Sequence, residues 1–344
     1  MKKTSIKYFL LFIVATVIAA CVFVPIPYYI EKPGSTIDLK QLVTVNGNED
    51  KQPGSFSLTS VGVQQATVLT ALKSKFSSFE QLVSEEEMFG GSSGEEYDQI
   101  QRYYMESSQN NAIEQALKQA GRPYDFEYKG VYVMSVEPKS NFYHDISVGD
   151  TVTQVDGKHF ENNQEFIDYV QNKKVDDEVT ITFIHQNKQK QATGKLIELS
   201  TKKPGIGITL VDHTEIESDD KIDFHVENIG GPSAGLMFTL EIYEQLTKQD
   251  LRKGKKIAGT GTINNEGEVG RIGGIDKKVA SADQEGMEIF FAPDDELTAE
   301  EKAAYPELQS NYEEAKAAAE KIHSKMKIVP VKTLQDALDY LENM

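Results

Sequence analysis

The stretches Gly231-Pro232-Ser233-Ala234-Gly235 and Arg271-Ile272-Gly273-Gly274-Ile275-Asp276-Lys277-Lys278 carry the most informative pattern in this chain. The first places a serine where a helix is expected to begin, because proline suits the first turn. The second places two lysines in the first turn of another helix. A serine needs a nearby base to become a nucleophile, and a neutral lysine can serve as that base. The two stretches therefore predict a Ser-Lys hydrolase.

The loop around the serine suits such chemistry. Its small residues let a substrate backbone approach closely. Backbone N–H groups at a helix start have no intrahelical partner and can hold an oxyanion. We therefore expect an oxyanion and substrate loop made of Gly230, Gly231, Pro232 and Ala234. The plainer interpretation is that the serine only caps its helix.

Helical spacing distinguishes the two lysines. Ile275, Val279 and Ala282 recur on one side of a helix, which we expect to face the core. Lys278 flanks that side, whereas Lys277 points roughly 100° away from it. Burial and the positive end of the helix dipole both disfavour a charged amine. Lys278 is therefore the candidate base, the alternative being that it is an ordinary surface lysine.

The pentapeptide also fits the Gly-x-Ser-x-Gly turn that holds the nucleophile of α/β-hydrolases. Those enzymes need an acidic residue and then a histidine after the serine. Only His323 follows Ser233, within a polar segment, and the remaining chain is short for that fold. The other five histidines are scattered without metal-ligand spacing. The sequence thus disfavours an esterase of this type and predicts no metal site.

The totals restrict the classes of partner. The 344 residues suffice for two or three domains. The 54 acidic and 36 basic residues give a formal net charge of -18, which argues against nucleic-acid binding. Cys21 is the only cysteine, so an intrachain disulfide and a cysteine-based zinc cluster are excluded. We expect no cofactor.

The amino terminus departs from this acidic balance. Lys2, Lys3 and Lys7 precede an uncharged stretch, residues 8–30, whose first part is continuously apolar or small. This pattern predicts a single-pass signal anchor in the cell membrane, with the basic flank in the cytoplasm and the rest of the chain outside. A cleaved signal peptide and lipid modification of Cys21 are the alternatives.

A β-rich unit over residues 127–200 contains Gly149-Asp150-Thr151-Val152-Thr153-Gln154-Val155-Asp156-Gly157, a strand closed by an Asp-Gly turn. This signature resembles that of PDZ domains. The resemblance implies that an extended peptide adds a strand to the unit. The carboxylate-binding loop of that family usually has a Gly-Leu-Gly-like sequence. We place it near residues 127–133, where Lys129-Gly130-Val131-Tyr132-Val133 lacks that sequence.

Residues 201–344 contain further motifs around the serine and lysine, namely Gly259-Thr260-Gly261-Thr262-Ile263, Gly267-Glu268-Val269 and Ile272-Gly273-Gly274. With the pentapeptide and Lys278, they resemble the proteolytic domain of Lon proteases. The resemblance implies that Ser233 is the nucleophile, that Lys278 is its base and that Thr260 orients the lysine. Lon usually has glutamate where Thr262 stands, so Thr262 is assigned no role.

The order of segments extends the resemblance to nearly the whole chain. An anchor (1–30), strands and helices (31–126), a PDZ-like unit (127–200) and a Lon-like domain (201–344) together predict an α+β protein. This order is similar to that of the membrane-anchored, PDZ-containing Lon-like serine proteases of Gram-positive bacteria, the SepM and YlbL groups.

The resemblance implies an ATP-independent endopeptidase that cleaves extracytoplasmic peptides or unstructured proteins, including secreted peptide pheromones. The sequence has no Gly-x-x-x-x-Gly-Lys-Ser/Thr phosphate loop. Lon-like domains often form rings, so a homo-oligomer is a candidate assembly. The alternative is an anchored PDZ peptide-binding scaffold with an inactive Lon-like domain. The intact Ser233 and Lys278 argue against that scaffold.

Overall fold

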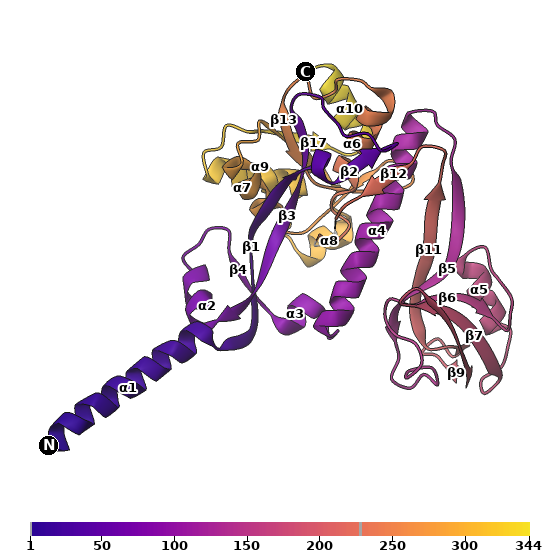
Figure 1. Cartoon of the computed structure of the whole chain (residues 1–344), viewed down its shortest axis with the longest axis horizontal. Helices are drawn as coiled ribbons and strands as arrows, with labels where there is room; N and C mark the ends of the chain where they lie inside the picture. Colours follow the sequence, from indigo (N-terminus) through magenta and orange to yellow (C-terminus); the bar gives the residue numbers. More distant parts are fainter. Residues whose placement is uncertain (1, 227–228) are drawn as a thin grey trace. The chain divides into compact units, whose positions relative to one another are not determined.

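The computed structural model describes residues 2–226 and 229–344 and divides the chain into two compact units (Figure 1). Unit 1 comprises Met1–Thr44, Glu49–Ser92 and Ser233–Met344, and unit 2 comprises Val45–Asn48 and Ser93–Pro232. Apart from the short segment Val45–Asn48, the chain thus begins in unit 1, forms unit 2 and returns to unit 1. Both units combine helices and strands, so the expected α+β class is confirmed.

Unit 1 is built on a mixed six-stranded sheet. Its strands are β1 (Pro25–Asp38), β3 (Ser55–Thr67), β4 (Gln81–Ser84), β13 (Lys256–Gly259), β16 (Ile289–Pro293) and β17 (Lys327–Val331). The order across the sheet is β17-β16-β13-β3-β1-β4. β1 pairs antiparallel with β3 and β4, while β3, β13, β16 and β17 are mutually parallel. The parallel pairing of β3 with β13 joins the two distant parts of the chain in one sheet.

Helices and short elements complete unit 1. The helices are α1 (Lys2–Phe23), the 3-10 turn η1 (Leu39–Gln41), α2 (Val68–Ser74), α3 (Glu85–Phe89), α6 (Gly235–Thr247), α7 (Ile275–Gln284), α8 (Ala299–Ala304), α9 (Asn311–Lys321) and α10 (Leu334–Glu342). The short strands are β2 (Val43–Val45), β14 (Thr262–Ile263) and β15 (Val269–Gly270). Serine or threonine caps begin several of these helices, as at α2, α9 and α10.

Alternating side chains of β16 place helices on both faces of the sheet. Phe290 belongs to a buried cluster with Val279 of α7 and Ala315 of α9. The next residue, Phe291, points the opposite way and meets the ring of Tyr340 in α10 edge-on at 5.7 Å. Unit 1 is therefore a layer of strands between two layers of helices, which buries the central strands on both sides.

α1 is the one helix in the described part of the chain that is long and apolar enough to cross a membrane, over Ile6–Phe23. Its apolar side chains are exposed in the protein. β1 begins at Pro25, so only Val24 separates the helix from the sheet. The apolar helix is consistent with a single-pass membrane protein.

Unit 2 contains one long helix and a five-stranded antiparallel sheet. Its helices are α4 (Gly94–Gln119) and α5 (Asn163–Gln171). Its strands are β5 (Asp125–Val136), β6 (Thr151–Val155), β7 (Glu178–His185), β8 (Lys188–Lys195), β9 (Ile197–Glu198), β10 (Pro204–Gly205), β11 (Ile208–Glu217) and β12 (Ile222–Phe224). The main sheet has the order β11-β5-β6-β7-β8.

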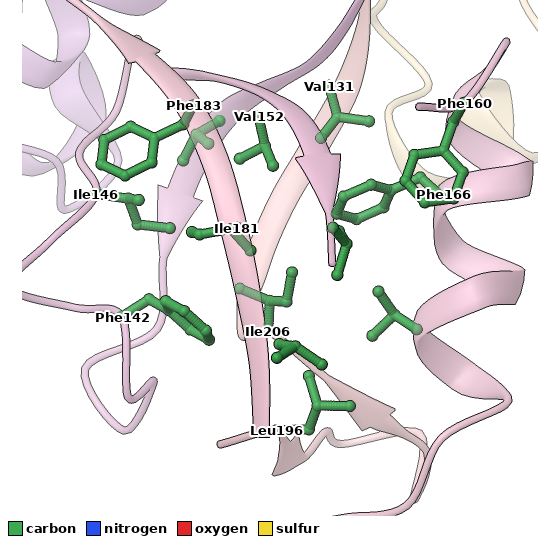
Figure 2. Close-up of a cluster of buried hydrophobic side chains, with 14 residues drawn as sticks. Val131, Phe142, Ile146, Val152, Phe160, Phe166, Ile181, Phe183, Leu196 and Ile206 are labelled. Atoms are coloured by element: carbon green, nitrogen blue, oxygen red, sulfur yellow. The ribbon is translucent and has the colours of Figure 1, made fainter. Parts of the chain in front are cut away.

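A compact apolar core holds this sheet against α5 (Figure 2). Val131, Val152 and Ile181 come from three neighbouring strands, and Phe166 comes from α5. Unit 2 is longer than the β-rich unit expected over residues 127–200, because its main segment begins at Ser93 and ends at Pro232. β11 lies beyond residue 200 but pairs with β5 along its length, from Ile208 with Val136 to Glu217 with Asp125. This strand alternates only weakly in hydrophobicity, so its partner was not evident from its sequence.

Candidate active site

Ser233 lies immediately before α6, as the pentapeptide predicts. Ala234 is buried at the N-cap position of this helix, and the first turn has no side-chain cap. The carbonyl oxygen of Ser233 accepts two hydrogen bonds, from the hydroxyl of Thr260 at 3.0 Å and from the N–H of Gly261 at 2.9 Å. Ser233 is thus held by the segment that follows β13 and does not act as a capping residue.

Lys278 reaches Ser233 from the first turn of α7. Gly274 adopts φ 66° just before this helix, a conformation that suits glycine. The Nζ atom of Lys278 lies 2.7 Å from the Oγ atom of Ser233. Lys277 turns elsewhere and donates to Gln81 at 3.1 Å. The structure therefore brings together the serine and the lysine that helical spacing selects.

Two further oxygen atoms surround the Lys278 amine. It donates to the backbone carbonyl of Thr59 and to the hydroxyl of Thr260, both at 3.0 Å. The Thr260 hydroxyl is free to accept because its own hydrogen goes to the Ser233 carbonyl. A neutral amine has two N–H groups and one lone pair. When the two N–H groups serve the threonines, the lone pair faces the serine hydroxyl.

Burial sets the protonation state of this amine. Lys278 is almost fully buried, and Thr260 beside it has no exposed surface. Desolvation lowers the pKa of Lys278 from 10.5 to about 7. No carboxylate contacts the amine among the described residues to oppose this shift. A substantial neutral fraction at neutral pH is what a general base requires.

The loop before Ser233 belongs to unit 2 and is held by α4. Gly231 adopts φ 88°, which favours glycine, and its N–H donates to the carbonyl of Gln101 at 2.9 Å. A side chain on Gly230 would also crowd Gln101. The carbonyl of Pro232 accepts a hydrogen bond from the buried hydroxyl of Ser108 at 3.0 Å. The expected oxyanion and substrate loop is therefore fixed from one side by a helix.

A second concave site lies within unit 2. A cavity of about 170 Å³ is bordered by apolar side chains of α5 and of the chain from β10 into β11, including Phe166, Ile167, Val170, Ile206, Ile208 and Leu210. β11 is the edge strand of its sheet. A Gly-Leu-Gly-like sequence, Gly205-Ile206-Gly207, forms one end of this groove.

The location differs from the one expected for the carboxylate-binding loop. Residues 127–133 were the expected position, but they lie inside β5, which pairs with β11 on one side and with β6 on the other. A strand paired at both edges has no free backbone for a peptide. The expected position is therefore wrong, and the matching sequence occurs about 75 residues later in the chain.

Sequence reasoning missed the contributions of Thr59, Gln101 and Ser108 to the catalytic region. Each lies more than 100 positions before its partner near Ser233 or Lys278. Thr59 contributes a backbone carbonyl, which any residue could supply, so its side chain gives no signal. Ser108 is one of several polar residues on a charged helix, and only the fold distinguishes it.

Two family models match this chain. The model described as "PDZ domain" matches residues 105–196, and the model described as "Lon protease (S16) C-terminal proteolytic domain" matches residues 178–342. Together they confirm the expected resemblance to PDZ-containing Lon-like proteases. The matches overlap over β7 and β8, which the structure places in the sheet of unit 2.

Curated relatives named "Lon protease" match over part of the chain. The protein of Aster yellows witches'-broom phytoplasma is 24% identical over 170 residues, which are 46% of this chain and 19% of the relative. The protein of Ureaplasma parvum is 35% identical over 114 residues, which are 32% of this chain and 14% of the relative. The chain therefore matches less than a fifth of the length of these relatives.

Solved structures match about a quarter of this chain. The PDZ domain of the SdrC-like protein from Listeria monocytogenes is 46% identical, and the match covers 25% of this chain and 90% of that domain with a TM-score of 0.24. The corresponding domain from Listeria innocua is 42% identical, with coverage of 24% and 96% and a TM-score of 0.24.

Proposed function

We propose that this chain, a PDZ-containing Lon-like protease by its matched domains, is an ATP-independent serine endopeptidase. It uses a Ser233–Lys278 dyad to cleave extracytoplasmic peptides or unstructured proteins, secreted peptide pheromones among them. The observation that carries this proposal is the 2.7 Å distance between Ser233 Oγ and a buried lysine amine whose pKa is lowered to about 7.

The catalytic cycle follows from this geometry. Neutral Lys278 accepts the hydroxyl proton of Ser233 while the serine oxygen attacks the carbonyl carbon of the scissile peptide bond. The carbonyl oxygen becomes an oxyanion beside the N–H groups of Ser233 and Ala234, which precede the first hydrogen bond of α6. Lys278 then gives the proton to the leaving amine. Water hydrolyses the acyl-enzyme by the same steps in reverse, so that the dyad is regenerated.

Thr260 is the proposed orienting residue. Its hydroxyl donates to the Ser233 carbonyl and accepts from the Lys278 amine, so one side chain fixes both members of the dyad. The Thr59 carbonyl takes the second N–H of the amine. These two acceptors select the rotamer in which the lone pair of Lys278 faces Ser233. The dyad is thus organised before substrate arrives.

The groove in unit 2 supports a peptide-binding role for the PDZ domain. An extended peptide can pair with the start of β11, around Ile208 and Leu210, and place a side chain in the apolar cavity beside α5. Further along β11, side chains of α4 already bond to the carbonyls of Asp212 and Thr214. Gly205-Ile206-Gly207 lies where a terminal carboxylate would meet backbone N–H groups. We propose that this groove selects substrates that have a free carboxyl terminus. An inactive scaffold with the same groove would bind the same peptides without cleaving them.

The proposed location is the cell membrane, with α1 as a single-pass anchor and both units outside the cytoplasm. The apolar span Ile6–Phe23 and the lysines before it support this orientation. In this location cytoplasmic ATP is out of reach. An activity independent of ATP is therefore consistent with the absence of a phosphate-loop motif from the sequence.

The decisive experiment compares the full chain with Ser233→Ala and Lys278→Ala in detergent, with and without ATP. Each form is incubated with casein and with a library of secreted peptides, and products are identified by mass spectrometry. Lys277→Ala is the matched control, because it removes the neighbouring lysine, whose amine bonds to Gln81.

We expect the wild type and Lys277→Ala to cleave substrate at equal rates with and without ATP. Neither Ser233→Ala nor Lys278→Ala should cleave it. Cleavage that survives in both dyad variants would refute the assigned dyad. If no form cleaves any substrate while a peptide library still binds the PDZ groove, the scaffold function replaces the protease.

A further inference from the structure

Apolar side chains gather on the exposed side of α2 and the turn after it. Outside α1 and Val24, twelve large apolar side chains of the described residues are exposed, and five of them lie between residues 63 and 76. Leu69 and Leu72 are 51% and 55% exposed, and Phe76 is 91% exposed. Leu69 and Leu72 lie three residues apart on one side of α2, and Phe76 lies in the turn after the helix, which ends at Ser74. With Val68, which is 40% exposed, they form the α2 face.

The hairpin of β1 and β3 places this face at the end of α1. α1 ends at Phe23, β1 begins at Pro25, and Pro25 pairs with Thr67, the last residue of β3. α2 begins at the next residue, Val68, and packs against α1 (Figure 1). The α2 face therefore lies beside the point where the apolar helix leaves its membrane span.

The charges within the α2 segment are basic, and the nearest acidic residue along the chain is Glu80. Lys73 and Lys75 are exposed on and just after the helix. The stretch from residue 55 to residue 79 contains no aspartate or glutamate, although the whole chain has a formal net charge of -18. Exposed leucine and phenylalanine next to lysine, without acidic residues, is the composition of helices that lie in a membrane interface.

We propose that the α2 face is a lipid-binding surface, which inserts Leu69, Leu72 and Phe76 into the headgroup region of the bilayer that α1 spans. Lys73 and Lys75 meet the phosphates of anionic lipids. This inference rests on the proposed anchoring by α1 and adds a second point of contact. Two contacts fix the tilt of unit 1 against the membrane, which a single helix cannot do.

A second copy of the chain is the competing occupant of such an apolar face. The position of the face argues for lipid, because the bilayer is already adjacent wherever α1 is inserted. The two lysines argue for it as well, because a symmetric contact between two copies would bring like charges together.

The absence of tryptophan from the sequence allows a direct test. Phe76→Trp gives a full chain with a single tryptophan, whose emission reports its surroundings. The matched control is Tyr305→Trp, at a 67% exposed aromatic position at the end of α8 in the same unit. Both variants are reconstituted in vesicles of phosphatidylcholine and phosphatidylglycerol, with or without lipids brominated near the headgroup end of their acyl chains.

We expect emission at shorter wavelength from the Phe76→Trp variant than from the control. Brominated lipids should reduce its intensity to roughly half or less, because an interfacial side chain lies about 5–10 Å into the headgroup boundary. The control should be unaffected. Adding Leu69→Glu and Leu72→Glu to Phe76→Trp should return the emission to that of the control.

Three results would overturn the inference. Emission and quenching equal to the control would place the α2 face in water. A short-wavelength emission that bromine does not quench, and that shifts when the protein is diluted in lipid, would place it against a second copy. Resistance to carbonate extraction, measured on the same samples, reports the α1 anchor separately. If carbonate removes the chain from the vesicles, both the α1 anchor and the lipid-binding α2 face are refuted. If the chain stays in the vesicles but bromine does not quench Phe76→Trp, only the lipid-binding α2 face is refuted.

Discussion

The backbone carbonyl of Thr59 accepts a hydrogen bond from the Lys278 amine at 3.0 Å, although 219 residues separate them. The side chain of Thr59 contributes as well, because its hydroxyl donates to the carbonyl of Gly259 at 3.2 Å. β3 therefore fixes the lysine directly and fixes the strand that leads to Thr260. The dyad depends on both halves of the interrupted unit.

The pH dependence of cleavage should report the Lys278 amine. Because the neutral amine is the base, kcat/KM should be low in acid, rise through an apparent pKa near 7 and level off above it. Peptide hydrolysis measured from pH 5 to pH 10 checks this. A rate that does not change between pH 5 and pH 9 would contradict lysine as the base.

Replacing Lys278 by methionine should abolish cleavage and stabilise the fold. The pKa of Lys278 is lowered from 10.5 to about 7, so between these values the folded state binds fewer protons than the unfolded state. The free energy of unfolding of the wild type therefore rises with pH between about 7 and 10.5. Below about pH 7 the wild type bears the full penalty of burying a charged amine at Lys278. We expect Tm to increase by about 2–8 °C at pH 6, equivalent to about 1–2 kcal/mol. Calorimetry should show the gain shrinking toward pH 10; an equal gain at both pH values would argue against a charged-amine penalty.

Thr260 should affect the rate through the position of the dyad. Thr260→Val keeps the shape but removes the hydroxyl that joins Ser233 and Lys278, and should lower kcat by about 10- to 100-fold. Thr260→Ser retains the hydroxyl and should recover most of the rate. KM should change little in either variant. Equal losses in the two variants would show that packing, and not the hydroxyl, matters at this position.

Ser108 should influence catalysis from unit 2. Ser108→Ala leaves the carbonyl of Pro232 without its donor, at a cost of about 1–3 kcal/mol for an unsatisfied buried group. Because Pro232 precedes Ser233, we expect kcat to fall several-fold while KM and PDZ-peptide affinity stay constant. The neighbouring, half-buried Ser107 offers the control, Ser107→Ala. Identical kinetics of the two variants would remove Ser108 from the catalytic region.

A buried charge cluster lies beneath the C-terminal half of α6. Arg252 has no exposed surface and contacts Asp50, Glu241 and Glu244, with 2.7 Å to Glu244 and 3.6 Å to Glu241. Desolvation outweighs the attraction of Arg252 and raises the pKa of Glu241 from 4.5 to about 8. Lys40 also lies 4.0 Å from Asp50, and the raised pKa of Glu241 favours its protonated form at neutral pH.

This protonation state predicts a second pH effect on stability. The protonated Glu241 contributes to the free energy of unfolding. This contribution is fully present below about pH 4.5 and is lost as pH rises through about 8. Glu241→Gln keeps an acceptor for Gln245 and stays neutral at every pH. Its stability should equal that of the wild type at pH 5 and exceed it by about 1–2 kcal/mol at pH 9. Urea unfolding at both pH values tests this, and a destabilised variant at pH 9 would show that the carboxylate is charged and needed.

The sequence predicted that Ser233 and Lys278 lie together, and the structure places them in contact. It did not predict the residues that hold them in place. Ser233 and Lys278 each belong to a local motif, and the 3.6-residue period alone separates Lys278 from Lys277. Thr59 and Ser108 reach the site through pairings between distant segments, and local spacing contains no information about such pairings. The carboxylate-binding loop is expected at the wrong place for a related reason, because the strand that borders the groove follows the expected end of the domain.

The interruption of unit 1 by unit 2 also determines when the Ser233–Lys278 site can first assemble. The Thr59 hydroxyl meets Gly259 across 200 residues of chain, so β3 has no parallel neighbour until β13 has been synthesised. Until then the first strands cannot form a catalytic centre, and the lysine comes later still. A partly synthesised chain therefore lacks the contact between Ser233 and Lys278, which forms only when most of the polypeptide is present. The order of the strands thus postpones assembly of the site until the C-terminal part of the chain exists.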